Sequence, residues 1–345
     1  MGRHDGPGIV AYGVYFPSRR ISSDEYRRAW GSCAAAIKEK AVPDFDEDSL
    51  TMAVEASRRA LLSGPRRDPG TAAVLALATT SAPYAEKALA STVVSSLGLP
   101  PDIVTVECTT SSRAGAEALE LATMVLAEKR KPGAWGLVAA ADAPRAAPHD
   151  PLEHGLGAGA VAIVLGWEDV LARLVGRCSW VEESLGERFR RAGQERLNDM
   201  GVREVTGSVF DRVAGAAVGG LLEASGLKPA DYRYLVVPQH DGRAGLQLAR
   251  RLGFKEEQVR PAFLFDRTGD VGVCSCLVGL AAVLDVAAPG ERVILVAYGS
   301  GAAASALDLE VTAEAGAHRR PQVGPALDGG VPVDYLEYLK LRRML

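Results

Sequence analysis

The feature that most constrains the fold is a series of short apolar runs, each bounded by turn residues and long enough for one strand. Continuous runs of this kind are typical of strands covered on both faces. They lie at residues 8–13, 73–78, 103–106, 136–141, 158–166, 234–237 and 292–298. Stretches with helical patterning lie between them, at residues 49–62, 87–97, 112–129, 209–225, 244–252 and 277–287. Because strand and helix alternate, the sequence predicts an α/β fold.

The order of elements is repeated in the two parts of the chain. In each part a helical stretch is followed by a strand and a Gly/Ala-rich segment, at residues 112–166 and 273–309. We therefore expect two similar halves, residues 1–170 and 171–345, rather than two unrelated domains. The Arg/Glu-rich stretch from Glu182 to Glu204 is predicted to be a solvated excursion before the pattern restarts at Ser208.

Composition argues against several kinds of partner and site. Lys and Arg total 39 against 43 Asp and Glu, and the basic residues are scattered, so no nucleic-acid partner is expected. The five cysteines are an odd number set mostly among small or apolar residues, which favours reduced thiols in a cytoplasmic protein without a metal site. The longest apolar runs are strand-sized, so no membrane span is expected. Residues 1–8 lack the pattern of a signal peptide.

Motifs for common cofactors are missing from the sequence. It contains no P-loop, no HExxH pair and no GxSxG elbow. The glycines of residues 155–159 lack the spacing of a dinucleotide fingerprint and favour close backbone packing instead. No tightly bound cofactor is therefore predicted.

Five segments resemble, in order and across nearly the whole chain, their counterparts in archaeal-type 3-hydroxy-3-methylglutaryl-CoA synthases. They are residues 13–17, 46–53, 150–166, 279–285 and 298–302. The closing run, residues 334–342, is also similar to the tail of these enzymes. They belong to the thiolase superfamily and are relatives of ketoacyl synthase type III. The resemblance implies a thiolase fold, with a duplicated core of five αβαβα layers, and acyl-CoA as a possible substrate.

The family uses a cysteine nucleophile at a helix N-terminus, where backbone N–H groups favour the thiolate. The matching motif here is Ser112-Arg113-Ala114-Gly115, so Ser112 is similar in position to that cysteine. A hydroxyl needs an adjacent base to act as a nucleophile. Cys108, four residues upstream, is the alternative nucleophile, and its other interpretation is a small buried residue at a strand end.

The other catalytic positions also depart from the family pattern. Thr80 lies where the resemblance implies a glutamate base, and it cannot accept a proton there. His240 lies about two positions from the family's histidine in an ungapped match, so it is either a site residue or a loop residue. Asp270 occupies the position of an asparagine that binds an oxyanion, and a carboxylate would repel that charge unless protonated.

These joint departures predict that the family's Claisen reaction is lost. The pattern resembles the synthase-like subunit of the phloroglucinol acetyltransferase complex, in which a thiolase-like subunit carries the reactive cysteine. That resemblance implies a structural or acyl-CoA-binding subunit of a multi-component acyltransferase or condensing complex. The implied partners are the thiolase-like catalytic subunit and an OB-fold zinc-ribbon acyl-CoA-binding protein that docks on residues 331–345. A homodimer or hetero-oligomer is also implied.

Two other functions remain open. The first is an active acyltransferase that uses acyl-CoA or an acyl carrier protein, with Ser112 or Cys108 as nucleophile and His240 as base. The second is a hydroxymethylglutaryl-CoA synthase with an unusual site, which we rank last because the acyl acceptor and the proton-transferring acid are both out of place.

Overall fold

The computed structural model describes residues 6–129, 131, 133–185, 187–199, 203–313 and 321–345. In these residues one sheet of nine strands forms the core, in the order β5-β4-β6-β7-β1-β8-β11-β10-β9. The strands are β1 (Gly8–Tyr15), β4 (Ala72–Ala78), β5 (Val104–Cys108), β6 (Trp135–Asp142), β7 (Gly159–Gly166), β8 (Ala172–Val181), β9 (Tyr234–Val236), β10 (Arg292–Gly299) and β11 (Ala303–Val311). The pairs β5–β4, β4–β6 and β10–β9 are parallel, and the other neighbours are antiparallel.

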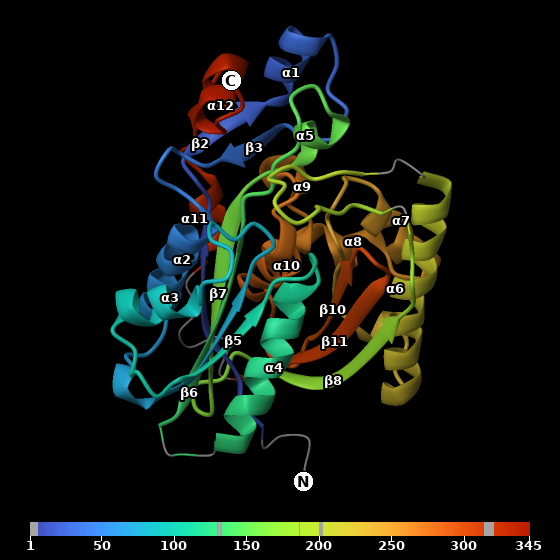
Figure 1. Cartoon of the computed structure of the whole chain (residues 1–345). Coiled ribbons are helices and arrows are strands. Elements are labelled where there is room, and N and C mark those ends of the chain that lie inside the picture. The colour runs from blue at the N-terminus through green and yellow to red at the C-terminus, as the bar shows by residue number, and fades with distance from the viewer. Residues whose placement is uncertain (1–5, 130, 132, 186, 200–202, 314–320) are drawn as a thin grey trace.

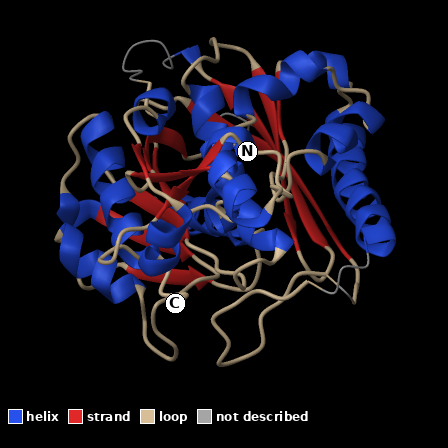
Figure 2. Ribbon diagram, turned by 90° about the horizontal axis from the view of Figure 1, so that it is seen from above, coloured by secondary structure: helices blue, strands red, loops and turns tan. Residues whose placement is uncertain are grey.

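Helices cover this sheet in layers (Figures 1 and 2). α2 (Ser49–Ser63) and α3 (Ala90–Leu97) pack on the outer face of the part formed by β1, β4, β6 and β7. α4 (Ala114–Lys129) and α10 (Ser275–Leu284) lie in the middle, and α6 (Arg203–Ser225) and α7 (Ala244–Arg251) cover the outer face of the part formed by β9, β10 and β11. All ten residues of α10 are buried, as expected for a helix that is apolar all round. The α/β class is confirmed.

A glycine allows the two middle layers to approach closely. A Cβ on Gly115 in α4 would overlap the carbonyl oxygen of Val273, in the 3-10 turn η4 (Gly272–Cys274) that precedes α10. Because backbone cannot move as a side-chain tip can, Gly115→Ala is expected to lower the free energy of unfolding by about 1–3 kcal/mol in urea titrations. Gly219→Ala, on an exposed site of α6 with open space around it, should instead raise it by about 0.5–1 kcal/mol. Equal effects of the two changes would contradict this packing.

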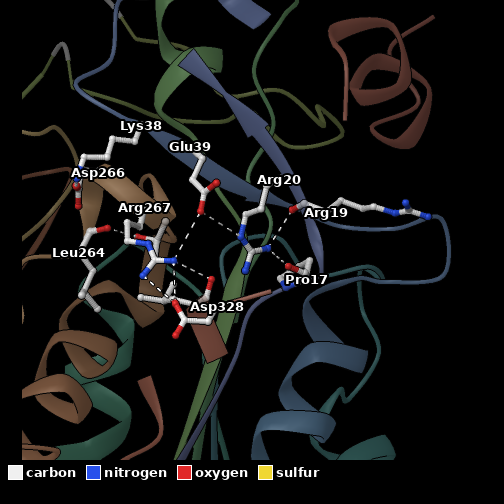
Figure 3. A network of polar contacts seen from close by, with 11 residues as sticks. Pro17, Arg19, Arg20, Lys38, Glu39, Leu264, Asp266, Arg267 and Asp328 are labelled. Carbon is white, nitrogen blue, oxygen red and sulfur yellow. Dashed lines mark hydrogen bonds and ion pairs between the residues drawn. The ribbon is translucent and has the colours of Figure 1, made fainter. Parts of the chain in front are cut away.

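A smaller layer, called the cap here, lies above the main sheet in Figure 1. Its three-stranded sheet has the order β12-β2-β3. Its elements are β2 (Arg19–Ser22), α1 (Ser23–Trp30), β3 (Glu39–Val42), α5 (Pro151–Gly155), β12 (Val331–Pro332) and α12 (Tyr335–Leu341). Figure 3 shows Glu39 between Arg20 and Arg267, with Arg267 also 3.3 Å from Asp328. These ion pairs join the cap to α9 (Phe265–Thr268) and to the end of α11 (Val323–Leu327).

The C-terminal tail packs against its own chain. β12 pairs in parallel with β2, and α12 places Tyr338 and Leu341 in the apolar cluster of the cap. Tyr338 is 4% exposed, whereas Leu336 is 54% exposed. Only the outer face of the tail is therefore open to a partner in this conformation.

Candidate functional site

The turn that carries Ser112 connects β5 to α4. Ser112 lies two residues before the first residue of α4, and its Oγ donates a hydrogen bond to the carbonyl oxygen of Tyr298 at 2.8 Å. The hydroxyl proton is therefore held by a backbone carbonyl rather than by a base. No hydrogen bond between Ser112 and His240 exists in the described part of the chain.

Three candidate residues from distant parts of the sequence meet at one small cavity. Ser112, His240 and Asp270 all line it, together with Pro238, Ser275 and Cys276. Its volume is about 20 Å³, which is room for a single water molecule. His240 is exposed at its edge, where its ring makes an edge-to-face contact with Phe210. The cavity as it stands cannot hold an acyl group.

Asp270 is buried and fully engaged. Its backbone pairs with Gly155 and Gly157, which holds the loop rigidly beside β7. Its Oδ1 accepts a hydrogen bond from the backbone N–H of Gly272 at 2.9 Å, and its Oδ2 accepts one from the guanidinium of Arg188. Asp270 is 2% exposed. Both oxygens of the Asp270 carboxyl group are therefore engaged as acceptors within the fold.

Arg188 belongs to a stretch that we call the cover segment, residues 182–199 without residue 186, in the yellow-green loop between β8 and α6 (Figure 1). The neighbouring Glu187 is 8% exposed and accepts hydrogen bonds from the backbone N–H groups of Gly301 and Ala302, at 2.6 and 3.2 Å. It also accepts one from the hydroxyl of Tyr298. The cover segment is thus bonded to two walls of the cavity, Tyr298 and Asp270.

Most of residues 182–199 are exposed or half-buried, as predicted for a solvated excursion, while residues 200–202 lie outside the described part of the chain and residues 203–204 begin α6. The prediction is wrong at two consecutive charged residues, Glu187 and Arg188, which turn inward. The physical reason is long-range: the buried carboxylate of Asp270 needs a cation, and the backbone N–H groups of Gly301 and Ala302 need an acceptor. Charge density along the sequence carries no signal for such pairing.

Thr80 serves a different group. It follows β4, and its backbone N–H and hydroxyl both donate to the carboxylate of Asp142, each at 2.8 Å. Asp142 ends β6 and is fully buried. Its six hydrogen-bond donors are Thr79 Oγ1, Thr80 N, Thr80 Oγ1, Ser81 N, Ser81 Oγ and Val273 N. Thr80 is therefore a hydrogen-bond donor to a buried carboxylate. Asp142, which holds the turn after β4 and the backbone of Val273 together through these bonds, was not identified from the sequence.

A larger cavity lies on the other side of Thr80, with a volume of about 320 Å³. Its walls are the acidic run of residues 44–48, the cover segment at Arg190 and Leu197, and the tail at residues 341–343. Arg190 donates a hydrogen bond to the carbonyl oxygen of Thr80 at 2.6 Å. Thr80 thus lines this cavity and not the one beside Ser112.

The cysteines near the site are poorly suited to nucleophilic attack. Cys108 ends β5 outside the small cavity, and burial, followed by the charge of Glu117, raises the pKa of its thiol to about 11. Burial raises the pKa of Cys276 to about 12 and raises the pKa of Cys274 well above its ordinary value. Thiols with raised pKa are thiolates to a very small extent at neutral pH.

The residues that the structure describes hold neither a cluster of metal-binding side chains nor a membrane-spanning helix. No three His, Cys, Asp or Glu side chains gather there as a metal site would require. None of the helices in the same residues is both long and apolar enough to cross a bilayer.

The chain is similar to known condensing enzymes. Residues 222–311 match the family model for the C-terminal part of 3-oxoacyl-[acyl-carrier-protein] synthase III. The hydroxymethylglutaryl-CoA synthase of Methanopyrus kandleri is 35% identical over 346 residues, covering 98% of this chain and 97% of that protein. The synthase of Methanothermobacter thermautotrophicus is 36% identical over 346 residues, covering 98% of this chain and 99% of that protein.

Solved structures agree on the fold. A synthase in complex with 3-hydroxy-3-methylglutaryl coenzyme A has a TM-score of 0.89 at 22% identity, covering 99% of this chain and 92% of that one. The hydroxymethylglutaryl-CoA synthase PksG from Bacillus subtilis has a TM-score of 0.86 at 19% identity, covering 98% of this chain and 88% of that one. The resemblance to hydroxymethylglutaryl-CoA synthases is confirmed, and the chain belongs to the hydroxymethylglutaryl-CoA synthase family of the thiolase superfamily.

Proposed function

We propose that the chain is the synthase-like subunit of a multi-component acyltransferase or condensing complex and does not itself catalyse the Claisen step of its family. The observation that carries the proposal is the Arg188–Asp270 ion pair at a cavity of about 20 Å³. A Claisen condensation needs room for two acyl groups and a donor for the oxyanion. Here a carboxylate forms part of one wall, and the cover segment is bonded to two of the lining residues, Asp270 and Tyr298.

Proton transfer is also unsupported. A general base must lie within hydrogen-bond reach of the proton it takes. The Ser112 hydroxyl donates to the Tyr298 carbonyl, which takes no proton, and Thr80 donates to Asp142. The residues at the family's catalytic positions therefore act as hydrogen-bond donors and ion-pair partners within the fold.

The partners of the proposed complex are a thiolase-like subunit with the reactive cysteine and an OB-fold zinc-ribbon protein that binds acyl-CoA. The outer face of the tail, with Leu336 and Leu345 exposed at 54% and 74%, supports docking of the second partner. β5 is an edge strand of the main sheet, and the adjoining α4 exposes Leu121 and Met124. An unpaired edge beside exposed apolar side chains supports a homodimer or hetero-oligomer. Bound acyl-CoA would be a substrate of the complex.

One observation favours the alternative function, an active acyltransferase. Ser112 and His240 line the same cavity, so a rearrangement of the cover segment would bring a hydroxyl and an imidazole to one opening. In that function Ser112 would be acylated by acyl-CoA or by an acyl carrier protein.

Activity of the reconstituted complex distinguishes the two functions. With the thiolase-like subunit and the OB-fold protein added, Ser112→Ala should change the rate of acyl transfer by less than about twofold, because Ser112 holds only the Tyr298 carbonyl. Loss of a true nucleophile would lower the rate by more than about a thousandfold. The control replaces the reactive cysteine of the thiolase-like subunit with alanine, which should abolish transfer. A thousandfold loss in Ser112→Ala would reject the proposed function.

A further inference from the structure

His154, in α5 of the cap, is held in one protonation state by its hydrogen bond. Its Nδ1 accepts the backbone N–H of Ala34 at 2.9 Å, so Nδ1 carries no proton. The neutral ring therefore carries its proton on Nε2, which is buried without a hydrogen-bond partner in the described residues. The side chain is almost fully enclosed, with 4% of the residue exposed. Protonation of Nδ1 would set one N–H against another and break the contact with Ala34.

The groups that face His154 oppose a positive charge on balance. Burial lowers its pKa to about 4, followed by the charges of Lys40 and His149, while Asp150 has the opposite effect. Tyr26, from α1, adds a ring contact at 4.4 Å between centroids. An imidazolium here would thus be desolvated and would lie near the ammonium of Lys40.

The same cluster holds the C-terminal helix. The ring of Tyr26 makes edge contacts with Tyr335 and Tyr338 of α12, at 5.6 and 6.0 Å between centroids. Lys40 Nζ lies 5.1 Å from the ring centroids of both Tyr26 and Tyr338. Tyr26, which supports α12, is therefore also the ring that His154 packs against.

Two further charged residues, Glu153 and Arg342, belong to the same cluster. Glu153 accepts hydrogen bonds from the hydroxyl of Tyr335 at 3.0 and 3.1 Å, and its backbone carbonyl accepts one from Lys40. Arg342, at the end of α12, donates to the carbonyl oxygen of Pro144 at 2.6 Å. Cys33 lies beside Ala34 and donates to the carbonyl oxygen of Ala35.

We propose that His154 is an acid-sensitive latch, which keeps residues 331–345 packed on the cap while it is neutral and releases them when it is protonated. The inference goes beyond the proposed function and does not rest on it. Release would expose the apolar face of α12 that carries Tyr338 and Leu341.

The sign of the effect follows from the groups that titrate. The pKa of His154 is about 6.5 in the unfolded chain and about 4 in the folded chain, and these two values bound the pH window in which it acts. Above pH 6.5 neutral His154 stabilises the docked tail, and this stabilisation is lost as the pH falls from 6.5 to 4. Burial lowers the pKa of Lys40 to about 7, so Lys40 is mostly charged at the upper end of the window and becomes fully charged toward its lower end. Burial raises the pKa of Glu153, and its protonation in acid acts in the opposite direction.

The test places a trifluoromethyl-phenylalanine at Leu336 on α12, and in a second sample at the exposed Leu62 on α2, in the full chain. ¹⁹F spectra are recorded from pH 8 to pH 4.5. The Leu336 signal is expected to move to a sharp line of a mobile segment with a midpoint between about pH 4.5 and 6.5, while the Leu62 signal stays. His154→Asn keeps an acceptor for Ala34 and does not titrate, so it should remove the transition or shift it by at least about one pH unit.

The matched control is His149→Gln, which should keep the transition, and His154→Gln is the second variant if the asparagine variant does not fold. Three results would overturn the latch. One is an unchanged midpoint in the His154 variants. Another is joint movement of the Leu336 and Leu62 signals, which means that the whole chain unfolds. The last is a Leu336 signal that does not move by pH 4.5.

Discussion

Replacing Arg188 by methionine is expected to lower the free energy of unfolding by about 3–5 kcal/mol, measured by urea titration at pH 7. Methionine keeps most of the volume but leaves the carboxylate of Asp270, 3% exposed in its side chain, without its cation. The remaining hydrogen bond from the backbone N–H of Gly272 cannot offset the free-energy cost of removing a full negative charge from water. Because an uncompensated buried carboxyl is easier to bury when protonated, the deficit should shrink as the pH is lowered.

Two further variants make the Arg188 prediction specific. Arg188→Met combined with Asp270→Asn removes both charges and should recover most of the lost stability, since a neutral pair costs far less to bury. Arg212 forms an exposed ion pair with Glu182 at the start of the same segment, and Arg212→Met should have only a small effect. Equal losses of unfolding free energy in the Arg188 and Arg212 variants would show that the Arg188–Asp270 ion pair does not stabilise the fold more than an exposed pair does.

Asp142→Ala is the second change with a large expected effect, a loss of about 4 kcal/mol or more in the free energy of unfolding. The carboxylate is the acceptor for the backbone N–H groups of Thr80, Ser81 and Val273, and a buried donor without a partner costs about 1–3 kcal/mol. These donors come from the turn after β4 and from the turn before α10, so the loss affects the contact between two parts of the fold.

Asp142→Asn tests the same point if the alanine variant does not fold. Asparagine keeps one acceptor oxygen but turns an NH₂ toward donors, so an intermediate loss is expected. Asp102→Asn, on the exposed turn before β5, is the matched control and should leave stability nearly unchanged. An Asp142 variant as stable as the Asp102 variant would contradict the role of Asp142 as an organising acceptor.

The fold could be predicted where burial leaves a pattern in the sequence. The apolar runs at residues 73–78, 136–141 and 292–298 correspond to β4, β6 and β10. β8 gave no such run, because it is partly exposed and carries Arg173 and Arg177. The Gly/Ala-rich segment after β10 forms β11, which was not predicted as a strand because its first residues are small rather than β-branched or aromatic.

The site could be predicted only in part, for a different reason. Resemblance to a family located the Ser112 turn and the Asp270 loop, and the structure brings both to one cavity with His240. The partner of Asp270 is 82 positions away in the chain, in a segment whose composition predicts a solvated loop. Pairing over such a distance depends on the assembled fold. Asp142 carried a weak signal, since it is an acidic residue at the end of the apolar run 136–141.

Intact-protein mass spectrometry after incubation with acetyl-CoA tests the central claim most directly. Wild-type chain, Ser112→Ala and Cys108→Ala are compared, each alone and with the thiolase-like subunit. The proposed function predicts no acetyl adduct on this chain in any sample and one acetyl group on the thiolase-like subunit. A stoichiometric acetyl adduct on the wild-type chain that disappears in Ser112→Ala or Cys108→Ala would contradict it and identify the nucleophile of an active acyltransferase.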